Sequence, residues 1–440
     1  MATQTSDRPG TVPARRTAEE RRVLAGTLVG TTIEWYDFFI YAQAAAFIFA
    51  PLFFEPVGSD SLAQIFSWAS IGISFLFRPL GAILAGHLGD RYGRKVVLVV
   101  TLVGMGAATA LIGVLPTYGT IGVAAPVLLI LLRILQGFSA GGEWGGAALM
   151  SVEHAPRDKR GLFGSYPQIG VPLGLILATS FMYILTKSLS EDDFQSWGWR
   201  IPFLSSLVLI VIGYLIRRSV DESPVYLDMQ ARQKDASAPL GRLFRDHWKN
   251  VLLAALIFAG NNATGYMIIA FFSSYGAKNL GMEKSQTLVA AIIGGVSWLV
   301  LTIYSGRISD RIGRRTTFAI GYVLLIAWVV PMWWFIDHGT TAMMTVAIVV
   351  LTLGLAPSYA PQSALYAEMF PADVRYSGTS IGYALGSILG GAFASTFAQM
   401  ILDGTGKSWT IGIYLGAMCL ISLVAVLLVP KSVEKSDLHI

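Results

Sequence analysis

Long apolar stretches alternate along the chain with short polar stretches that carry most of the charged residues. A helix needs about 20 mostly apolar residues to cross the hydrocarbon core of a bilayer. The pattern predicts twelve such helices, at 23–50, 62–86, 96–116, 121–150, 161–186, 200–217, 250–275, 285–305, 316–336, 341–366, 376–402 and 411–430. Runs such as 96–103 do not alternate apolar and polar residues, as strands of a membrane barrel would. We therefore expect an all-α polytopic membrane protein.

Composition narrows the class of protein further. The 440 residues are 54% hydrophobic and 13% charged, whereas soluble domains are about 25% charged. These values exclude a soluble enzyme, a nucleic-acid binder and a disordered scaffold. The single cysteine, Cys419, excludes an internal disulfide framework and a four-cysteine metal site. We expect neither a metal nor a cofactor.

The distribution of Lys and Arg predicts the orientation. With the N-terminus inside, 25 of the 32 basic residues fall in inside segments and five in outside loops. This bias predicts a multi-pass protein of the inner cell membrane with both termini in the cytoplasm. The net charge of +5 is then a topology signal, not a sign of nucleic-acid binding. The first predicted helix contains Glu34 and Asp37, which argues against a cleaved signal peptide.

Two loop motifs repeat at nearly one offset. Gly86-x3-Asp90-Arg91-x-Gly93-Arg94-Lys95 recurs as Gly306-x3-Asp310-Arg311-x-Gly313-Arg314-Arg315. Glu153-x2-Pro156-x-Asp158-x-Arg160 recurs as Glu368-x2-Pro371-x-Asp373-x-Arg375. We therefore predict two six-helix bundles, at 23–219 and 250–430. A cytoplasmic linker at 220–249 joins them, and cytoplasmic tails occupy 1–22 and 431–440.

The first loop motif resembles the signature of the major facilitator superfamily, as does Arg133-x2-Gln136-Gly137. Three further stretches resemble its metabolite:proton symporter branch: Gly30-x3-Glu34-x2-Asp37-Phe38-x2-Tyr41, Gly141-Gly142-Glu143-Trp144-Gly145-Gly146 and Gly164-Ser165-x-Pro167-Gln168-x-Gly170. The resemblance implies the twelve-helix fold of that superfamily and transport by alternating access. Members of the branch carry shikimate, 2-oxoglutarate, citrate, and proline or betaine.

Five charges lie well inside the predicted spans: Glu34, Asp37, Glu143, Arg78 and Arg133. Each would cost about 2.5–3.5 kcal/mol if it faced lipid, so they indicate a polar pathway. No comparable charge lies deep in the C-terminal half. We therefore expect the proton chemistry in the N-terminal half.

Spacing and depth suggest a mechanism. Glu34 and Asp37 are three residues apart and share one helix face, and Arg133 with Gln136 reaches the same depth from the fourth helix. Asp37 is the predicted main proton carrier and Glu34 the second, while Arg133 and Gln136 hold an anionic substrate group. A substrate carboxylate on Arg133 would remove the counter-ion of the acid, which then takes a proton. The alternative is a fixed ion pair that joins helices.

Other residues have less certain roles in this prediction. Arg78 is a second substrate contact, a gate residue or a structural partner of Glu143. Trp35, Tyr36 and Trp144 are candidates for the cationic end of a zwitterion. The C-terminal half offers candidate neutral contacts, with helix packing as the alternative: Asn261, Asn262, Tyr266, Tyr359, Gln362 and Tyr383.

The resemblance implies that the repeated loops form a gate. Its predicted residues are Asp90, Arg91, Gly93, Arg94, Asp310, Arg311, Arg314 and Glu143. The alternative is that the loops set only turn geometry and topology, because Asp90 can begin a tight turn that Gly93 permits.

We expect a monomeric secondary transporter that imports a small organic acid with protons, namely a shikimate-like, keto- or hydroxy-carboxylate. Uptake of a zwitterion such as proline or betaine and proton-exchange efflux are the alternatives. A Gly-x-Ser-x-Gly sequence at 137–141 matches a hydrolase motif, but that motif requires a strand-to-helix turn and a base. We therefore do not expect an enzyme.

Overall fold

The computed structural model describes residues 14–54, 59–92, 94–218, 239–371 and 374–435. Within these ranges every regular element is a helix. In the first half of the chain these are α1 (Ala14–Phe47), η1 (Ala50–Phe54), α2 (Asp60–Tyr92), α3 (Arg94–Val114), α4 (Tyr118–Ile121), α5 (Ala124–Ala140), α6 (Glu143–Glu153), η3 (Arg157–Lys159), α7 (Arg160–Ser188), α8 (Glu191–Asp193), η4 (Phe194–Gly198) and α9 (Arg200–Arg218).

The second half begins with a short helix inside the predicted linker. Its elements are α11 (Pro239–Asp246), α12 (Trp248–Tyr266), η5 (Met267–Phe271), α13 (Phe272–Asn279), α14 (Lys284–Ile312), α15 (Arg314–Trp328), α16 (Met332–Ile336), α17 (Thr341–Leu355), α18 (Gln362–Met369), α19 (Arg375–Ser387), η6 (Ile388–Ala392), α20 (Ala394–Thr405), α21 (Trp409–Leu428) and η7 (Lys431–Lys435).

Helices coincide with all twelve predicted segments, although several are broken. Within the described ranges, seven helices are long and apolar enough to cross a membrane, and a pair bent by 43° raises this to eight. The π-helical turns η5 and η6 interrupt two of the spans. Twelve spans, the two-bundle boundaries and the placement of both termini in the cytoplasm remain predictions.

Local sequence explains where several helices begin and end. Glu283 and Gln286 form a capping box at the start of α14. Gly313, the glycine of the second repeated loop, ends that helix with φ of 93°, a conformation that a residue with a Cβ rarely adopts. This conformation agrees with the turn role predicted for that glycine position.

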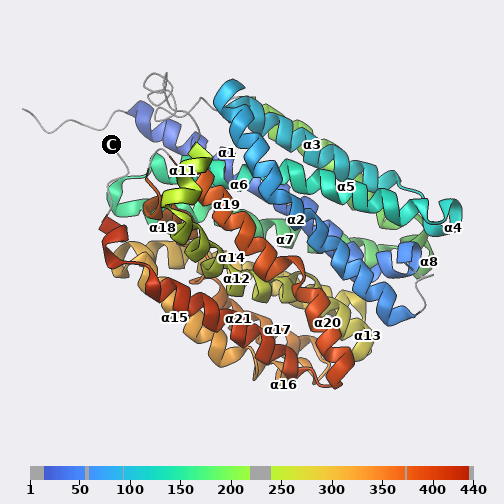
Figure 1. Cartoon of the computed structure of the whole chain (residues 1–440). Helices are drawn as coiled ribbons and strands as arrows, with labels where there is room; N and C mark the ends of the chain where they lie inside the picture. The colour runs from blue at the N-terminus through green and yellow to red at the C-terminus, as the bar shows by residue number, and fades with distance from the viewer. Residues whose placement is uncertain (1–13, 55–58, 93, 219–238, 372–373, 436–440) are drawn as a thin grey trace, which may run out of the picture.

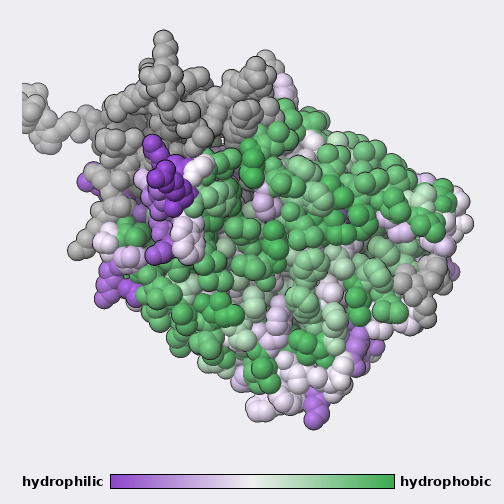
Figure 2. Space-filling view, in the orientation of Figure 1, coloured by the Kyte–Doolittle hydropathy of each residue, from purple (hydrophilic) through white to green (hydrophobic). Residues whose placement is uncertain are grey.

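The helices of the two halves gather on opposite sides of the molecule (Figure 1). Helices α1, α2 and α7 of the first half pack against η5, α19 and α14 of the second half along the interface between them. A broad apolar surface covers the visible face between more polar ends, as expected for contact with lipid (Figure 2).

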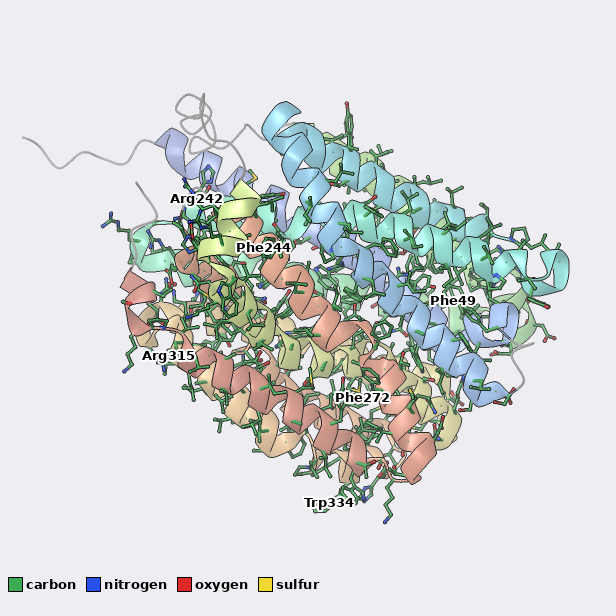
Figure 3. All side chains as sticks on the ribbon, viewed as in Figure 1. Phe49, Arg242, Phe244, Phe272, Arg315 and Trp334 are labelled. Carbon is green, nitrogen blue, oxygen red and sulfur yellow. The ribbon has the colours of Figure 1, made fainter. Side chains whose placement is uncertain are left out.

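Three labelled residues identify the two ends of the molecule. Arg242 and Arg315 lie at the end where α1 begins, whereas Trp334 lies at the opposite end (Figure 3). We call the first end the predicted cytoplasmic end and the second the predicted outer end. Large aromatic side chains such as Phe49 and Phe272 are buried between the helices.

Candidate transport pathway

Two acidic side chains of α1, Glu34 and Asp37, are buried and point to different neighbours. Glu34 and Asp37 are each 1% exposed. Asp37 accepts a hydrogen bond from the Ser206 hydroxyl on α9, at 2.5 Å between Oγ and Oδ1. Glu34 faces α2, where its Oε1 lies 3.5 Å from Nη2 of Arg78. The structure therefore separates the environments of two acids that the sequence placed on one helix face.

Arg78 lies among aromatic rings beside Glu34. Its guanidinium carbon is 4.3 Å from the centroid of Phe38, 4.6 Å from Phe75 and 5.5 Å from Trp35. Neither its Nε nor its Nη2 makes a hydrogen bond within the described structure. Arg78 thus has a buried positive charge, one ion pair and unused donors.

Arg133 has a different environment. Its guanidinium donates to the Gln136 Oε1 at 2.5 Å and the Ser74 hydroxyl at 2.8 Å. It also donates to the carbonyl oxygens of Ser70 and Ile71, at 3.4 and 3.2 Å. These bonds join α5 to α2. The substrate contact predicted for Arg133 stays a prediction. In this structure its guanidinium donates hydrogen bonds to protein groups of the first half.

The other predicted substrate residues also have partners. Gln136 donates to Thr109 at 2.7 Å. Tyr36 faces α9, where its hydroxyl lies 2.8 Å from that of Ser205. Asn261 donates to protein oxygens, and Tyr266 packs edge-on against Phe75 with ring centroids 5.6 Å apart.

A small central cavity lies between the two halves. Its volume is about 10 Å³, which is room for about one water molecule. Trp35 and Val171 line it from the first half, and the second half contributes Phe258, Asn261, Asn262, Gly265, Tyr266, Ile269, Trp298 and Tyr359. The predicted candidate contacts that line this cavity are Trp35, Asn261, Asn262, Tyr266 and Tyr359.

The two halves touch at the predicted outer end. Lys284 of α14 pairs with Glu191 at 2.5 Å, and Lys187 at the end of α7 pairs with Glu283 at 3.3 Å. Ser61 donates to Asp403 at 2.5 Å. Deeper inside, Gln43 donates at 2.6 Å to the carbonyl oxygen of Ile269 in the π-helical turn η5.

The halves also touch at the predicted cytoplasmic end. Asp310 of α14 accepts hydrogen bonds from the backbone N–H groups of Gly161 and Leu162 at the start of α7, at 2.7 and 2.9 Å. The N-terminus of a helix is a favourable place for a carboxylate. Arg314 lies 3.3 Å from Asp310 and 3.5 Å from Glu368.

The second repeated motif pairs across the two halves. Arg160, which ends the first copy, lies 3.8 Å from Glu368, which begins the second copy. Arg375, which ends the second copy, lies 3.8 Å from Glu153, which begins the first copy. Sequence analysis identified the repeat but did not predict this exchange. The shared spacing of an acid and an arginine was the available signal.

The remaining predicted gate residues are less well defined. Glu143 is buried in the first turn of α6, and Arg311 is exposed beside Asp310. The side chains of Asp90, Arg91 and Arg94, with Gly93, lie outside the residues that the structure describes in full. Their roles stay predictions.

Sequence analysis named Trp144 and Tyr383 as candidate substrate contacts but did not predict that they stack on each other across the halves. Trp144 of α6 stacks on Tyr383 of α19, with centroids 3.8 Å apart and planes 7° apart. The Trp144 indole donates to Gln168 at 3.1 Å. Phe258 stacks on Tyr383, with ring centroids 4.6 Å apart, and on Tyr359, with ring centroids 5.9 Å apart. An aromatic side chain in an apolar span has no sequence signal that separates it from lipid-facing residues.

Comparison with known proteins identifies the family. The model of the Major Facilitator Superfamily matches residues 36–381. The chain belongs to this superfamily. The assignment suggested by the loop motifs is thereby confirmed.

Curated relatives of this superfamily member are transporters. It is 38% identical over 420 residues to the inner membrane metabolite transport protein YhjE of Escherichia coli, covering 94% of this chain and 95% of the relative. It is 36% identical to the shikimate transporter of the same organism, with the same coverage. It is 32% identical to a protein of Staphylococcus haemolyticus named as a proline/betaine transporter, covering 92% of this chain and 86% of the relative. The superfamily member is thus a multi-pass membrane transporter of metabolites, not an enzyme.

Solved structures agree on the fold. The structure of the proton:xylose symporter XylE superposes with a TM-score of 0.76 at 17% identity, over 95% of this chain and 97% of that chain. At this identity the likeness concerns the fold alone.

Proposed function

We propose that this transporter imports a small organic acid together with protons by alternating access, acting as a monomer in the inner cell membrane. The observation that carries the proposal is the buried pair of Glu34 and Arg78. The Arg78 guanidinium lies 5.5 Å from the ring of Trp35, which lines the central cavity. A charged pair inside a membrane span is costly to keep, and such residues commonly mark substrate and proton pathways.

Arg78 is the first contact of the substrate carboxylate in this proposal. Its Nε and Nη2 atoms make no hydrogen bond in the described structure, although Nη2 forms the 3.5 Å ion pair with Glu34, and aromatic rings lie against the charge. A flat guanidinium matches a carboxylate through two parallel hydrogen bonds. The sequence-based candidate Arg133 keeps a supporting role, because its donors hold Gln136 and α2.

Proton coupling follows from competition for Arg78. An arriving carboxylate displaces Glu34 from its cation, and a buried carboxylate without a cation is expected to bind a proton. Asp37, one turn further along α1, makes no ion pair among the described residues and accepts from Ser206. That environment supports its predicted role as the main proton carrier, with Glu34 as the second.

The contacts at the predicted cytoplasmic end are the inner gate in this scheme. Asp310, Arg314 and their partners on α7 and α18 close that end, and the ion pairs of Lys187 and Lys284 close the outer end. Alternate release of the two sets would expose the central cavity to one side at a time. The loop residues Asp90, Arg91, Gly93, Arg94 and Arg311 belong to this proposed gate as predicted from sequence.

The test is proton flux in liposomes that contain the purified protein. Symport of an added organic acid makes the outside more alkaline, whereas exchange acidifies it. Asp37→Asn should abolish proton-driven accumulation, because the amide cannot carry the proton. Asp246→Asn, a change at an exposed acid at the end of α11, is the matched control. Full accumulation by Asp37→Asn would refute the proton role of Asp37, and acidification outside would refute symport.

A further inference from the structure

The short helix α11 is held to the protein by one face and exposes the others. Leu243 is fully buried and belongs to the hydrophobic core, and α11 contacts α12 and α19. Arg242, Phe244 and Arg245 are exposed. Because Arg242 and Phe244 are two residues apart, they project from nearly opposite sides of the helix (Figure 3). The exposed part of α11 therefore has both basic and aromatic side chains.

This exposed surface continues into the start of α12. Trp248, the first residue of α12, is exposed, and so is Lys249, whose Nζ lies 5.9 Å from the centroid of the Trp248 ring. Phe244, Trp248 and Leu252 follow one another at intervals of four residues, and each is about half exposed. Trp248 also begins a helical segment that is long and apolar enough to cross a membrane. We therefore expect Phe244 and Trp248 to lie where the acyl chains of a bilayer meet the headgroups.

We call these exposed side chains the α11 surface, which consists of Arg242, Phe244, Arg245, Trp248 and Lys249. Hydrophilic residues over α11 lie beside the broad apolar surface of the molecule (Figure 2). Asp246 is an acid next to the α11 surface, and its Oδ1 lies 3.7 Å from Nε of Arg245. Both of these side chains are exposed, and an exposed ion pair contributes little to stability. Arg245 can therefore exchange Asp246 for another anion.

A phospholipid offers a partner to both kinds of side chain on the α11 surface. Aromatic rings lie favourably at the level of the headgroups, and the long side chains of Lys and Arg reach the phosphate groups. Three basic residues and one neighbouring acid leave an excess of positive charge here. An anionic headgroup has a net negative charge to match this excess, whereas a zwitterionic headgroup has none. Charge complementarity therefore favours an anionic lipid.

We propose that the α11 surface binds the headgroup of an anionic phospholipid in the leaflet at the predicted cytoplasmic end. Arg242, Arg245 and Lys249 bind the phosphate groups, and Phe244 and Trp248 lie beside the first carbons of the acyl chains. This site lies outside the proposed transport pathway, and its role does not depend on which substrate is carried.

The test measures lipid binding to the full-length protein in phosphatidylcholine vesicles. The quencher is either dibrominated phosphatidylglycerol or dibrominated phosphatidylcholine. A bimane group on Gly241→Cys reports quenching, since no atom lies within 4 Å of the Cβ added there and the native Cys419 is buried. Phosphatidylglycerol should bind at least about fivefold more tightly, which is the effect of about one basic residue at an anionic surface. Added salt should reduce this preference.

Paired substitutions locate the preference. Arg245→Gln combined with Lys249→Gln should reduce it to less than about twofold, while quenching by phosphatidylcholine remains. Lys159→Gln combined with Lys431→Gln is the matched control, because it removes the same charge from two other exposed positions at this end. The control should retain the full preference. Arg245→Gln alone, which should weaken the preference at least about twofold, replaces the double variant if that protein does not fold.

Three outcomes would overturn the proposal. Equal quenching by the two lipids would mean that α11 contacts lipid without selecting its charge. Absence of quenching by both lipids would place α11 away from the bilayer, where its partner would be a soluble molecule. An equal loss of preference in the control variant would assign the effect to the overall charge of this end. Proton flux on adding an organic acid tests the proposed function separately from all three.

Discussion

Two buried arginines on neighbouring helices have different chemical surroundings. Arg133 is fully buried, and its guanidinium donates to two side chains and two backbone carbonyls. Arg78 is 1% exposed, and it has Glu34 and three aromatic rings as neighbours. A guanidinium with satisfied donors stabilises helix packing, whereas one with unused donors can bind a ligand.

Substitution by lysine should separate the two roles. Arg78→Lys keeps the charge beside Glu34 but loses the flat fork, so the Kd for the transported acid should rise about tenfold with little change in Tm. Arg133→Lys cannot reach all four acceptors, so unfolding should become easier by about 1–3 kcal/mol. Thermal unfolding and substrate titration of both variants make the comparison. A large decrease in the Tm of Arg78→Lys with an unchanged Kd would instead give Arg78 the packing role and contradict its role in substrate binding.

The sequence alone predicts how deep these charged residues lie in the membrane, but not which neighbouring helix each side chain faces. Residue spacing put Glu34 and Asp37 on one face, yet small rotations decide that one meets Arg78 and the other Ser206. The alternative of a fixed acid–arginine pair between helices included Glu34, but spacing did not identify Arg78 as its partner.

At the scale of elements, α7 and α14 approach closely at the predicted cytoplasmic end. A Cβ on Gly161 would lie 2.1 Å from the Ser309 hydroxyl and 2.8 Å from the carbonyl oxygen of Gly306. A Cβ on Gly306 would lie 2.6 Å from the Ser165 hydroxyl. Small residues thus permit the contact through which Asp310 reaches the first turn of α7.

An added methyl group should therefore weaken closure at this end. Gly161→Ala and Gly306→Ala should shift the population toward a form open to the cytoplasm, since overpacking costs about 1–3 kcal/mol. A maleimide reagent should label Ser363→Cys, buried beside this contact, several-fold faster in these variants. The native Cys419 is buried.

Gly241→Ala is the control for this prediction, because no atom lies within 4 Å of the Cβ that it would add. Unchanged labelling in Gly161→Ala and Gly306→Ala would contradict a gate at the contact of α7 with α14.

The repeat predicted part of this element-scale arrangement. The repeated loop contains Gly313, which ends α14 at a φ of 93°, and Asp310, which lies within α14 and accepts from the first turn of α7. The exchange of Glu153 and Arg375 across the halves depends on how the halves face each other. No local pattern contains that information. The broken helices at η5 and η6 were also missed, because hydropathy does not distinguish a π-helical turn from a regular one.

At the scale of the whole molecule, contacts at both ends hold the halves together around a small cavity. At the predicted cytoplasmic end, Glu368 pairs with Arg160 of the first half and Arg314 of the second half. It lies two residues beyond the predicted span 341–366. Its burial raises its pKa from 4.5 to about 7, against the opposing effect of Arg314 and Arg160, while Glu434 and Asp310 raise the pKa further. A form in which this end opens would expose the carboxyl group to water and return the pKa toward its ordinary value.

The closed contact should therefore become more stable as the pH falls. Because the pKa of Glu368 is higher in the closed form, closure binds a proton over the range from about 7 down to about 4.5, and linkage favours closure there. Spin labels at Lys159→Cys and Lys431→Cys, both exposed at this end, would report the distance between the halves. In the otherwise native protein the closed fraction should rise as the pH is lowered through 7. In Glu368→Gln this part of the pH dependence should disappear, whereas an unchanged profile would assign it to another group, such as Asp37.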